Sequence, residues 1–189
     1  MKTLDLISEL RTITLQNIDF AQKLHDLPEE ELNWRNDAKS WSILECLEHL
    51  NIYGSFYLPE IESTIRNSVS SSESEFNPGF LGDYFAKSMQ PKAKLNKMKT
   101  FKKTDPIGSK LNRNVIDTFI VQQHKLLELL EASEKVDLNK LKTGISISKW
   151  IRIKLGDTFR FVIYHNQRHV LQAQRVLTAQ LQIIEKSEA

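Results

Sequence analysis

Hydrophobic residues recur at steps of three and four positions in several long stretches of the chain, which is the pattern of amphipathic helices. The first stretch covers Thr3 to Leu24. Its inward positions are Leu6, Leu10, Ile13, Asn17, Phe20 and Leu24. Because proline disrupts a helix interior, we expect this helix to end before Pro28.

The second helix is expected to begin at Ser42, because Ser42 and Glu45 have the spacing of a capping box. In that motif the serine oxygen accepts a backbone N–H three residues on, and the glutamate reaches back to the helix start. The buried face continues with Leu44, Leu47 and Leu50. Pro59 follows in the same stretch, and we expect it to kink the helix or divide it in two, since proline has no N–H to donate.

A third helix is predicted from about Leu111 to Ser133. Its inward positions are Val115, Phe119, Gln122 or Gln123, Leu126 and Leu130. Between residues 145 and 155, isoleucine or leucine stands at most odd positions, and this alternation indicates an extended segment.

The last helix is predicted from Thr158 to about Ile184, with Asp157 as its cap. Its opening is rich in β-branched and aromatic residues, which favour a strand. We nevertheless expect a helix, because the helical spacing persists through this opening. The positions that keep this spacing are Val162, His165, His169, Gln172 and Val176.

Four helices joined by long connections predict an all-α protein, a four-helix bundle with a short extended segment before its last helix. The length of 189 residues suits one domain over residues 1–189. Between its second and third helices, the serine- and glutamate-rich stretch Asn67 to Asn77 is expected to be a mobile loop. From Lys87 to Arg113, nine basic residues stand against one acidic residue, Asp105, which predicts a basic connecting arm.

Composition and charge exclude several classes of protein. With 26 basic and 24 acidic side chains, the net charge of +2 does not indicate nucleic-acid binding. No apolar run approaches the roughly 20 residues that cross a bilayer, so we expect no membrane span. Charged residues throughout the first fifteen positions speak against a signal peptide. The lone cysteine, Cys46, cannot form an internal disulfide, so we expect a reducing cytoplasm as the compartment.

Among the five histidines, His165 and His169 are the most informative. Residues four apart on a helix project to the same side, so both imidazoles can reach one metal ion. Such pairs also occur by chance, and a third ligand must then come from a neighbouring helix, where His49 is suitably placed. His25 is explained by the end of the first helix, and His124 by a solvated helix face.

Two familiar hydrolase motifs are absent from the sequence. Asn166 stands where the zinc-protease motif H-E-x-x-H needs its glutamate, and no G-x-S-x-G is present. Cys46 is more simply explained as a small buried hydrophobic residue than as a nucleophile. The catalytic residues therefore stay unassigned, and the sequence indicates no organic cofactor.

The stretch Lys39 to Leu50 (KSWSILECLEHL) and the later stretch His165 to Gln172 (HNQRHVLQ) together resemble the DinB-like superfamily. In that family a Trp-Ser/Thr-x-x-Glu-x-Leu-x-His-Leu opening of the second helix and a His-x-x-x-His in the fourth recur. The resemblance implies an up-down-down-up four-helix bundle. It also implies one divalent metal ion held by three histidines, which are His49, His165 and His169 in this sequence.

The family includes transferases that use low-molecular-weight thiols such as bacillithiol, mycothiol or glutathione, and a maleylpyruvate isomerase. Our leading hypothesis is therefore transfer of a small-molecule thiol to an electrophilic substrate, assisted by zinc or nickel, with iron and manganese as alternatives. A metal-dependent hydrolase and a non-enzymatic metal-binding or structural bundle remain the alternatives. We expect neither nucleic acid nor membrane as a partner, and a homodimer stays open.

Three more residues near the histidines are candidates for supporting roles. Glu45 could orient His49 as a hydrogen-bond acceptor, although the capping box already explains it. Gln172 could do the same for His169. Arg168 projects about 100° away from its histidine neighbours, so we expect it in a surface or inter-subunit ion pair.

Overall fold

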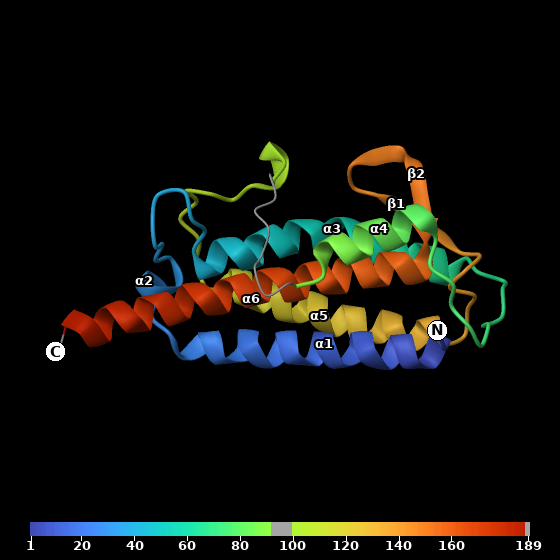
Figure 1. Cartoon of the computed structure of the whole chain (residues 1–189), viewed down its shortest axis with the longest axis horizontal. Coiled ribbons are helices and arrows are strands. Elements are labelled where there is room, and N and C mark those ends of the chain that lie inside the picture. Colours follow the sequence, from blue (N-terminus) through green and yellow to red (C-terminus); the bar gives the residue numbers. More distant parts are fainter. Residues whose placement is uncertain (92–99, 188–189) are drawn as a thin grey trace.

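The computed structural model of the chain describes residues 1–91 and 100–187, and it is mostly helical with a small two-stranded sheet in these residues. Four long helices lie alongside one another (Figure 1). They are α1 (Thr3–Lys23), α3 (Ile43–Arg66), α5 (Asn114–Ser133) and α6 (Leu155–Ser187). In the described part of the chain, no helix is long and apolar enough to cross a membrane.

The long helices pack into a bundle in which α1 and α3 each contact both α5 and α6. Its interior holds two groups of buried hydrophobic side chains, one around Phe159 and the other around Phe119. On α6, the part up to Tyr164 belongs to the first group and the part from Val170 belongs to the second. The segment between them carries polar residues inside the bundle.

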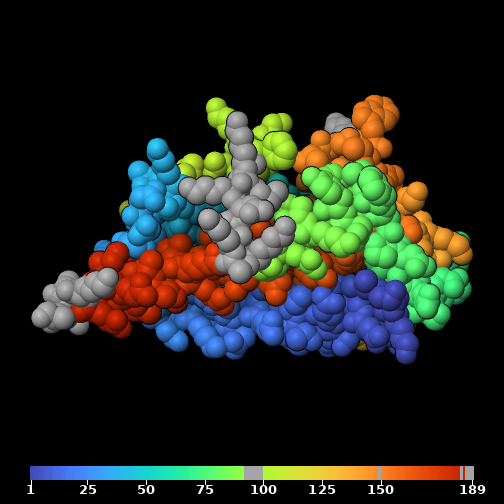
Figure 2. Space-filling model, viewed as in Figure 1, coloured from blue at the N-terminus to red at the C-terminus, as the bar shows by residue number. Residues whose placement is uncertain are grey.

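Shorter elements cover the bundle. They are η1 (Leu24–Asp26), α2 (Glu29–Leu32), α4 (Phe80–Met89), η2 (Lys102–Thr104), β1 (Lys142–Ile145) and β2 (Ser148–Lys154). β1 and β2 form an antiparallel hairpin. α4 packs on α6, and in the space-filling view α6 lies as a band between α1 and α4 (Figure 2).

The structure confirms the predicted long helices, including a helical start of α6 where propensity favours a strand. However, α6 begins at Leu155, three residues before the predicted start, so Asp157 lies in its first turn and is not its cap. The backbone N–H groups of Leu155 and Gly156 instead donate to the carbonyls of Leu141 and Leu138. The backbone before the helix thus replaces the side-chain cap that we expected.

Pro59 does not divide the second helix, because α3 continues through it from Ile43 to Arg66. The carbonyl that loses its helical partner is that of Ser55, four residues earlier. Both Ser55 and Pro59 are exposed, so water can bond the freed carbonyl. Leu58 and Ile61, buried on the other side, keep the helix packed across the proline.

The hairpin confirms the extended segment predicted between residues 145 and 155, although its partner strand β1 was not predicted. The stretch 67–77 is irregular, as expected, but its end is anchored. Phe76 is fully buried and its N–H donates to the carbonyl of Met1. A loop that is mobile throughout is therefore not what the structure shows.

Part of the predicted basic connecting arm, residues 87–113, lies in helical elements of the structure. Lys87 lies in α4, where it pairs with Asp83 at 2.6 Å. Lys102 and Lys103 are exposed in η2. The other lysines between Pro91 and Thr100 lie outside the described residues. The end of this stretch packs against α3 and reaches the site described next.

Candidate metal site

Three histidines from two helices converge inside the bundle, His49 from α3 and His165 and His169 from α6. Each offers one ring nitrogen, and these three atoms all lie within 4.8 Å of one another. The Nε2 atoms of His49 and His165 are 3.2 Å apart. His49 and His165 are buried, and His169 is partly buried. The structure thus brings together the three residues that the sequence singled out.

The outer ring nitrogens of two of these histidines have acceptor partners. Nδ1 of His49 lies 2.6 Å from the Thr104 carbonyl, and Nδ1 of His169 lies 2.9 Å from Oε1 of Gln172. An oxygen that can only accept requires a protonated Nδ1, which leaves Nε2 with a free lone pair. Both Nε2 atoms are then in the form that binds a metal. The expected partnership of Gln172 with His169 is confirmed.

All three imidazoles are held neutral at ordinary pH. Burial lowers the pKa of His49, although its bond to Thr104 and the Asp105 carboxylate oppose this. Burial and the other two histidines lower the pKa of His165 well below its usual value. Burial and His49 lower the pKa of His169 to about 3. Neutral imidazole is the form that ligates metal ions.

The cluster fits a cation better than it fits protons. A single proton between Nε2 of His49 and Nε2 of His165 satisfies those two atoms, but the lone pair of His169 Nε2 still faces them. A divalent ion accepts all three lone pairs at once, and three imidazoles are a common donor set for such ions. The residues present therefore fit a divalent metal.

Aromatic rings enclose the cluster. The Trp41 ring centre lies 4.8 Å from that of His49 and 5.4 Å from that of His169. The Tyr53 ring centre lies 4.9 Å from His49 and 4.6 Å from His165. Trp41 is buried and Tyr53 is partly exposed. We did not assign Tyr53 from the sequence, although its position four residues after His49 was the available signal.

Glu45 acts at the helix start and not on His49. Its carboxylate accepts the Ser42 N–H at 2.8 Å, which confirms the capping box. It also accepts two hydrogen bonds from Arg35, each 2.8 Å long. These partners lower its pKa, although its burial opposes them. The alternative role of Glu45 beside His49 is wrong, because the Thr104 carbonyl occupies that position.

Arg168 is buried, with 6% of its surface exposed, so the expected surface position is wrong, while the inter-subunit ion pair stays a prediction. The physical reason is that α6 is covered on all sides where it crosses the bundle: every residue from 155 to 166 is buried. A position turned about 100° from the histidines still falls inside. Its positive charge contributes to the lowered pKa values of His165 and His169.

The remaining candidates behave as their simpler explanations predicted. Cys46 is fully buried, and burial raises its pKa well above the usual range, so it is no nucleophile. His124 is exposed on α5. His25 lies in η1, directly after the end of α1, and its Nε2 is 3.4 Å from Oδ1 of Asp117.

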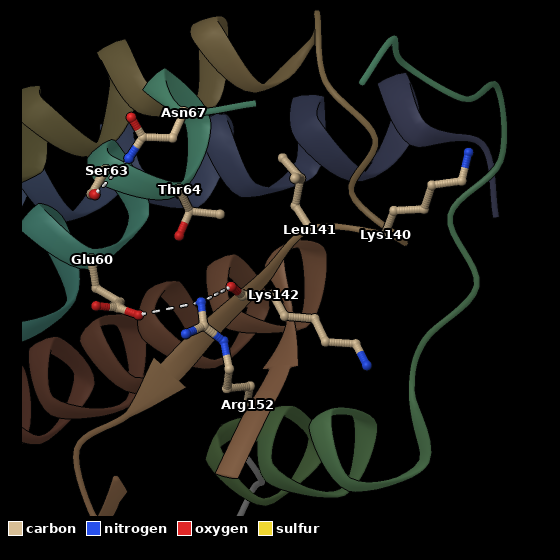
Figure 3. A pocket seen from close by; sticks show the side chains of 8 residues that line it. All are labelled: Glu60, Ser63, Thr64, Asn67, Lys140, Leu141, Lys142 and Arg152. Atoms are coloured by element: carbon tan, nitrogen blue, oxygen red, sulfur yellow. Dashed lines mark hydrogen bonds and ion pairs between the residues drawn. The ribbon is translucent and has the colours of Figure 1, made fainter. Parts of the chain in front are cut away.

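A separate polar cavity of about 480 Å³ lies between the end of α3 and the hairpin (Figure 3). Its lining includes Glu60 and Arg152, but none of the three histidines. The Glu60 carboxylate is engaged by the Gly144 N–H at 2.7 Å and lies 3.9 Å from Arg152. These contacts of Glu60 hold the hairpin against α3. The cavity is separate from the histidine cluster.

The fold and the cluster together define a helical bundle with three histidines facing one another in its interior. The family model of the DinB superfamily matches residues 16–173, and the chain belongs to this superfamily. The match spans both the Trp41–His49 motif and the His165–His169 pair. No curated protein and no solved structure gave a significant match.

Proposed function

We propose that this DinB superfamily protein binds one divalent metal ion through Nε2 of His49, His165 and His169. The observation that carries the proposal is the convergence of three neutral imidazole nitrogens within 4.8 Å. Zinc or nickel suits an all-imidazole site best, and iron or manganese is the alternative. Three protein ligands leave a position for a further ligand, which is typical of catalytic and not of structural sites.

The reaction that we propose is transfer of a low-molecular-weight thiol to an electrophilic carbon. A bound dication would deprotonate a coordinated thiol and so supply a nucleophile at neutral pH. The thiol proton would pass to solvent, and the sulfur would form a bond to the carbon, whose leaving group would depart with the bonding electrons. Gln172 and Thr104 orient the ligand rings, while Trp41 and the partly exposed Tyr53 limit the access of water.

Thiol transfer is favoured over hydrolysis by the surroundings of the cluster. Activation of water is aided by a general base, because water loses its proton far less readily than a thiol does. The buried carboxylate on the same helix, Glu45, is already engaged by Arg35, Ser42 and Gly108. A thiol, with an ordinary pKa of about 8.5, has less need of such a base.

We further propose that residues 1–189 form one domain with up-down-down-up helix order. Figure 1 supports this, because the colours along α1 and α6 advance in one direction along the bundle and those along α3 and α5 in the other. In such an arrangement α3 and α6 are neighbours of opposite direction. Their contacts bring His49 beside residues that are more than a hundred positions away in sequence.

Metal analysis of untagged protein tests the binding site. We expect close to one ion per chain in the wild type and in His124→Gln, whose histidine is exposed and outside the cluster. We expect His165→Gln to lose most of the metal. Equal metal content in all three proteins would refute the site.

Thiol transfer is tested by incubating the metal-loaded protein with a model electrophile, such as an epoxide, and a panel of small thiols. We expect the wild-type protein to form a thioether product faster than His165→Gln does under the same conditions. Hydrolysed electrophile without any thioether, produced only by the wild type, would favour the hydrolase instead.

A further inference from the structure

One short segment, Thr104–Gly108, lies against the histidine cluster, and we call it the strap. The carbonyl of its first residue accepts the Nδ1–H of His49 at 2.6 Å. The carboxylate of its second residue, Asp105, accepts the Nε1–H of Trp41 at 3.1 Å. The backbone N–H of its last residue donates to Glu45 at 2.5 Å. Three attachments therefore join the strap to the start of α3 and to Trp41, which directly precedes its cap.

The three residues that hold the strap lie at or just before the start of α3. Glu45 and His49 are four positions apart on one side of the helix, and Trp41 directly precedes the N-cap residue Ser42. All three are also positions of the motif on which the family resemblance rests. A motif that supplies one histidine ligand thus has two further members that bond the same five-residue segment.

We propose that the strap is a working part of the metal site and that Asp105 is its positioning residue. Asp105 holds the Trp41 indole against His49 and His169. It also holds the strap so that the Thr104 carbonyl keeps the proton of His49 on Nδ1. This inference rests on the proposed metal site, and it adds a residue outside both sequence motifs.

The geometry of Asp105 explains why this residue can perform both tasks. Its Oδ1 atom accepts the Trp41 Nε1–H and also the backbone N–H of Ile107, each at 3.1 Å. The same oxygen therefore shapes the turn of the strap and attaches it to α3. Both bonds need an acceptor oxygen but not a negative charge. An asparagine, whose amide oxygen also accepts, can take over the role.

The first test measures the position of the His49 proton in metal-free protein by ¹⁵N NMR of the imidazole rings. We expect a protonated Nδ1 in the wild type, in Asp105→Asn and in Lys103→Ala, which changes an exposed strap neighbour. In Asp105→Ala and in Trp41→Phe, we expect signals averaged between the two tautomers. Wild-type signals in both of these variants would overturn the inference.

The second test measures affinity for Co²⁺ from its absorption bands. Because outer partners of metal ligands typically contribute about 10- to 100-fold to affinity, we expect a loss of that order in Asp105→Ala and in Trp41→Phe. The double variant should lose no more Co²⁺ affinity than the single variant that binds Co²⁺ more weakly, because both substitutions remove the bond between Trp41 and Asp105. Asp105→Asn should bind like the wild type. Additive losses, or a loss in Asp105→Asn as large as in Asp105→Ala, would overturn the inference.

The two tests separate this inference from the proposed function. If wild-type protein binds no Co²⁺, the metal site fails, while the NMR test of the His49 proton still decides the role of the strap. If Asp105→Ala does not fold, Trp41→Phe decides, since it removes the N–H donor, keeps an aromatic ring at this position and leaves the bond between Asp105 and Ile107 in place.

Discussion

The chemistry of single side chains in this site depends on which nitrogen of each imidazole carries the proton. For His49 a backbone carbonyl decides this, and for His169 the amide oxygen of Gln172 does so. Both partners lie on the outer side of the rings, so the lone pairs face inward. The partnership of Gln172 was predictable from its helical spacing, whereas a backbone carbonyl more than fifty residues away leaves no trace in the side-chain pattern.

Replacing Gln172 tests this orientation. We expect Gln172→Leu to weaken metal binding by about 10- to 100-fold, because His169 loses the acceptor that fixes its tautomer. Gln172→Glu should retain affinity, since a carboxylate accepts the same bond. Competition against a chromophoric chelator measures the change, with Gln174→Leu as the control on the same helix. An affinity of Gln172→Leu equal to that of the control would contradict the proposed role.

The lowered histidine pKa values predict how the stability of metal-free protein depends on pH. In the unfolded chain a histidine has a pKa of about 6.5, whereas burial lowers the pKa of His169 to about 3. Below pH 6.5 the unfolded state therefore binds more protons, and the free energy of unfolding falls as the pH decreases. Above pH 6.5 both states are neutral at this position, so it adds no pH dependence.

Urea unfolding of metal-free protein at pH 7, 6 and 5 measures this slope. We expect His169→Gln to lose less stability than the wild type between pH 7 and pH 5, because it lacks the imidazole whose pKa is lowered on folding. Each unit of pKa shift corresponds to about 1.4 kcal/mol. His124→Gln, which changes an exposed histidine, serves as the control. Identical slopes for the wild type and His169→Gln would contradict the burial of a neutral imidazole.

Among the elements, the start of α3 determines where His49 and Trp41 lie. Its capping box was predictable because both partners are side chains three positions apart. The bond from Arg35 to the same carboxylate was not, since nothing in the local pattern relates positions 35 and 45. Glu45 is fully buried and accepts hydrogen bonds from three segments of the chain.

We expect Glu45→Ala to reduce the free energy of unfolding by about 3 kcal/mol, because it removes the carboxylate partner of Arg35 and the cap. Urea unfolding at pH 7 measures the effect. The control is Glu48→Ala, one turn along the same helix, where the side chain is only partly buried. Equal stability of the two variants would mean that the capping network contributes little.

The sequence predicted the long helices better than the short ones for a physical reason. A long amphipathic helix repeats its buried face several times, so its period is visible. The ten-residue α4 was missed, because it depends on contacts with α6, such as the bond from Arg160 to Asp83 at 2.8 Å. Short helices of this kind draw their stability from packing rather than from their own sequence.

For the molecule as a whole, the bundle brings together ligands from distant parts of the chain. The histidines lie where α3 and α6 pass each other, and on α6 they fall between the two buried hydrophobic groups. The convergence of His49 with the α6 pair was expected from the place of His49 on a neighbouring predicted helix and from the family resemblance. The packing of Trp41 and Tyr53 against the histidines, and the contacts of the strap, depend on the arrangement of the helices in space and could not be predicted from the sequence.

Metal binding at this junction should stabilise the whole fold, because an ion that binds only the native state shifts the folding equilibrium. We expect a chelator to lower the midpoint of thermal unfolding of metal-loaded wild type, by an amount that grows with metal affinity. The midpoint of His165→Gln should not respond. A chelator effect of the same size in both proteins would place the bound metal elsewhere.

X-ray absorption at the edge of the bound metal tests the three-histidine site most directly. We predict a first shell with three imidazole nitrogens at about 2.0 to 2.1 Å and a light atom in the remaining position when zinc is bound. Addition of a small thiol should introduce one sulfur at about 2.3 Å, which is the usual zinc–sulfur distance. A shell with fewer than three imidazoles, or one that is unchanged in His165→Gln, would contradict the account.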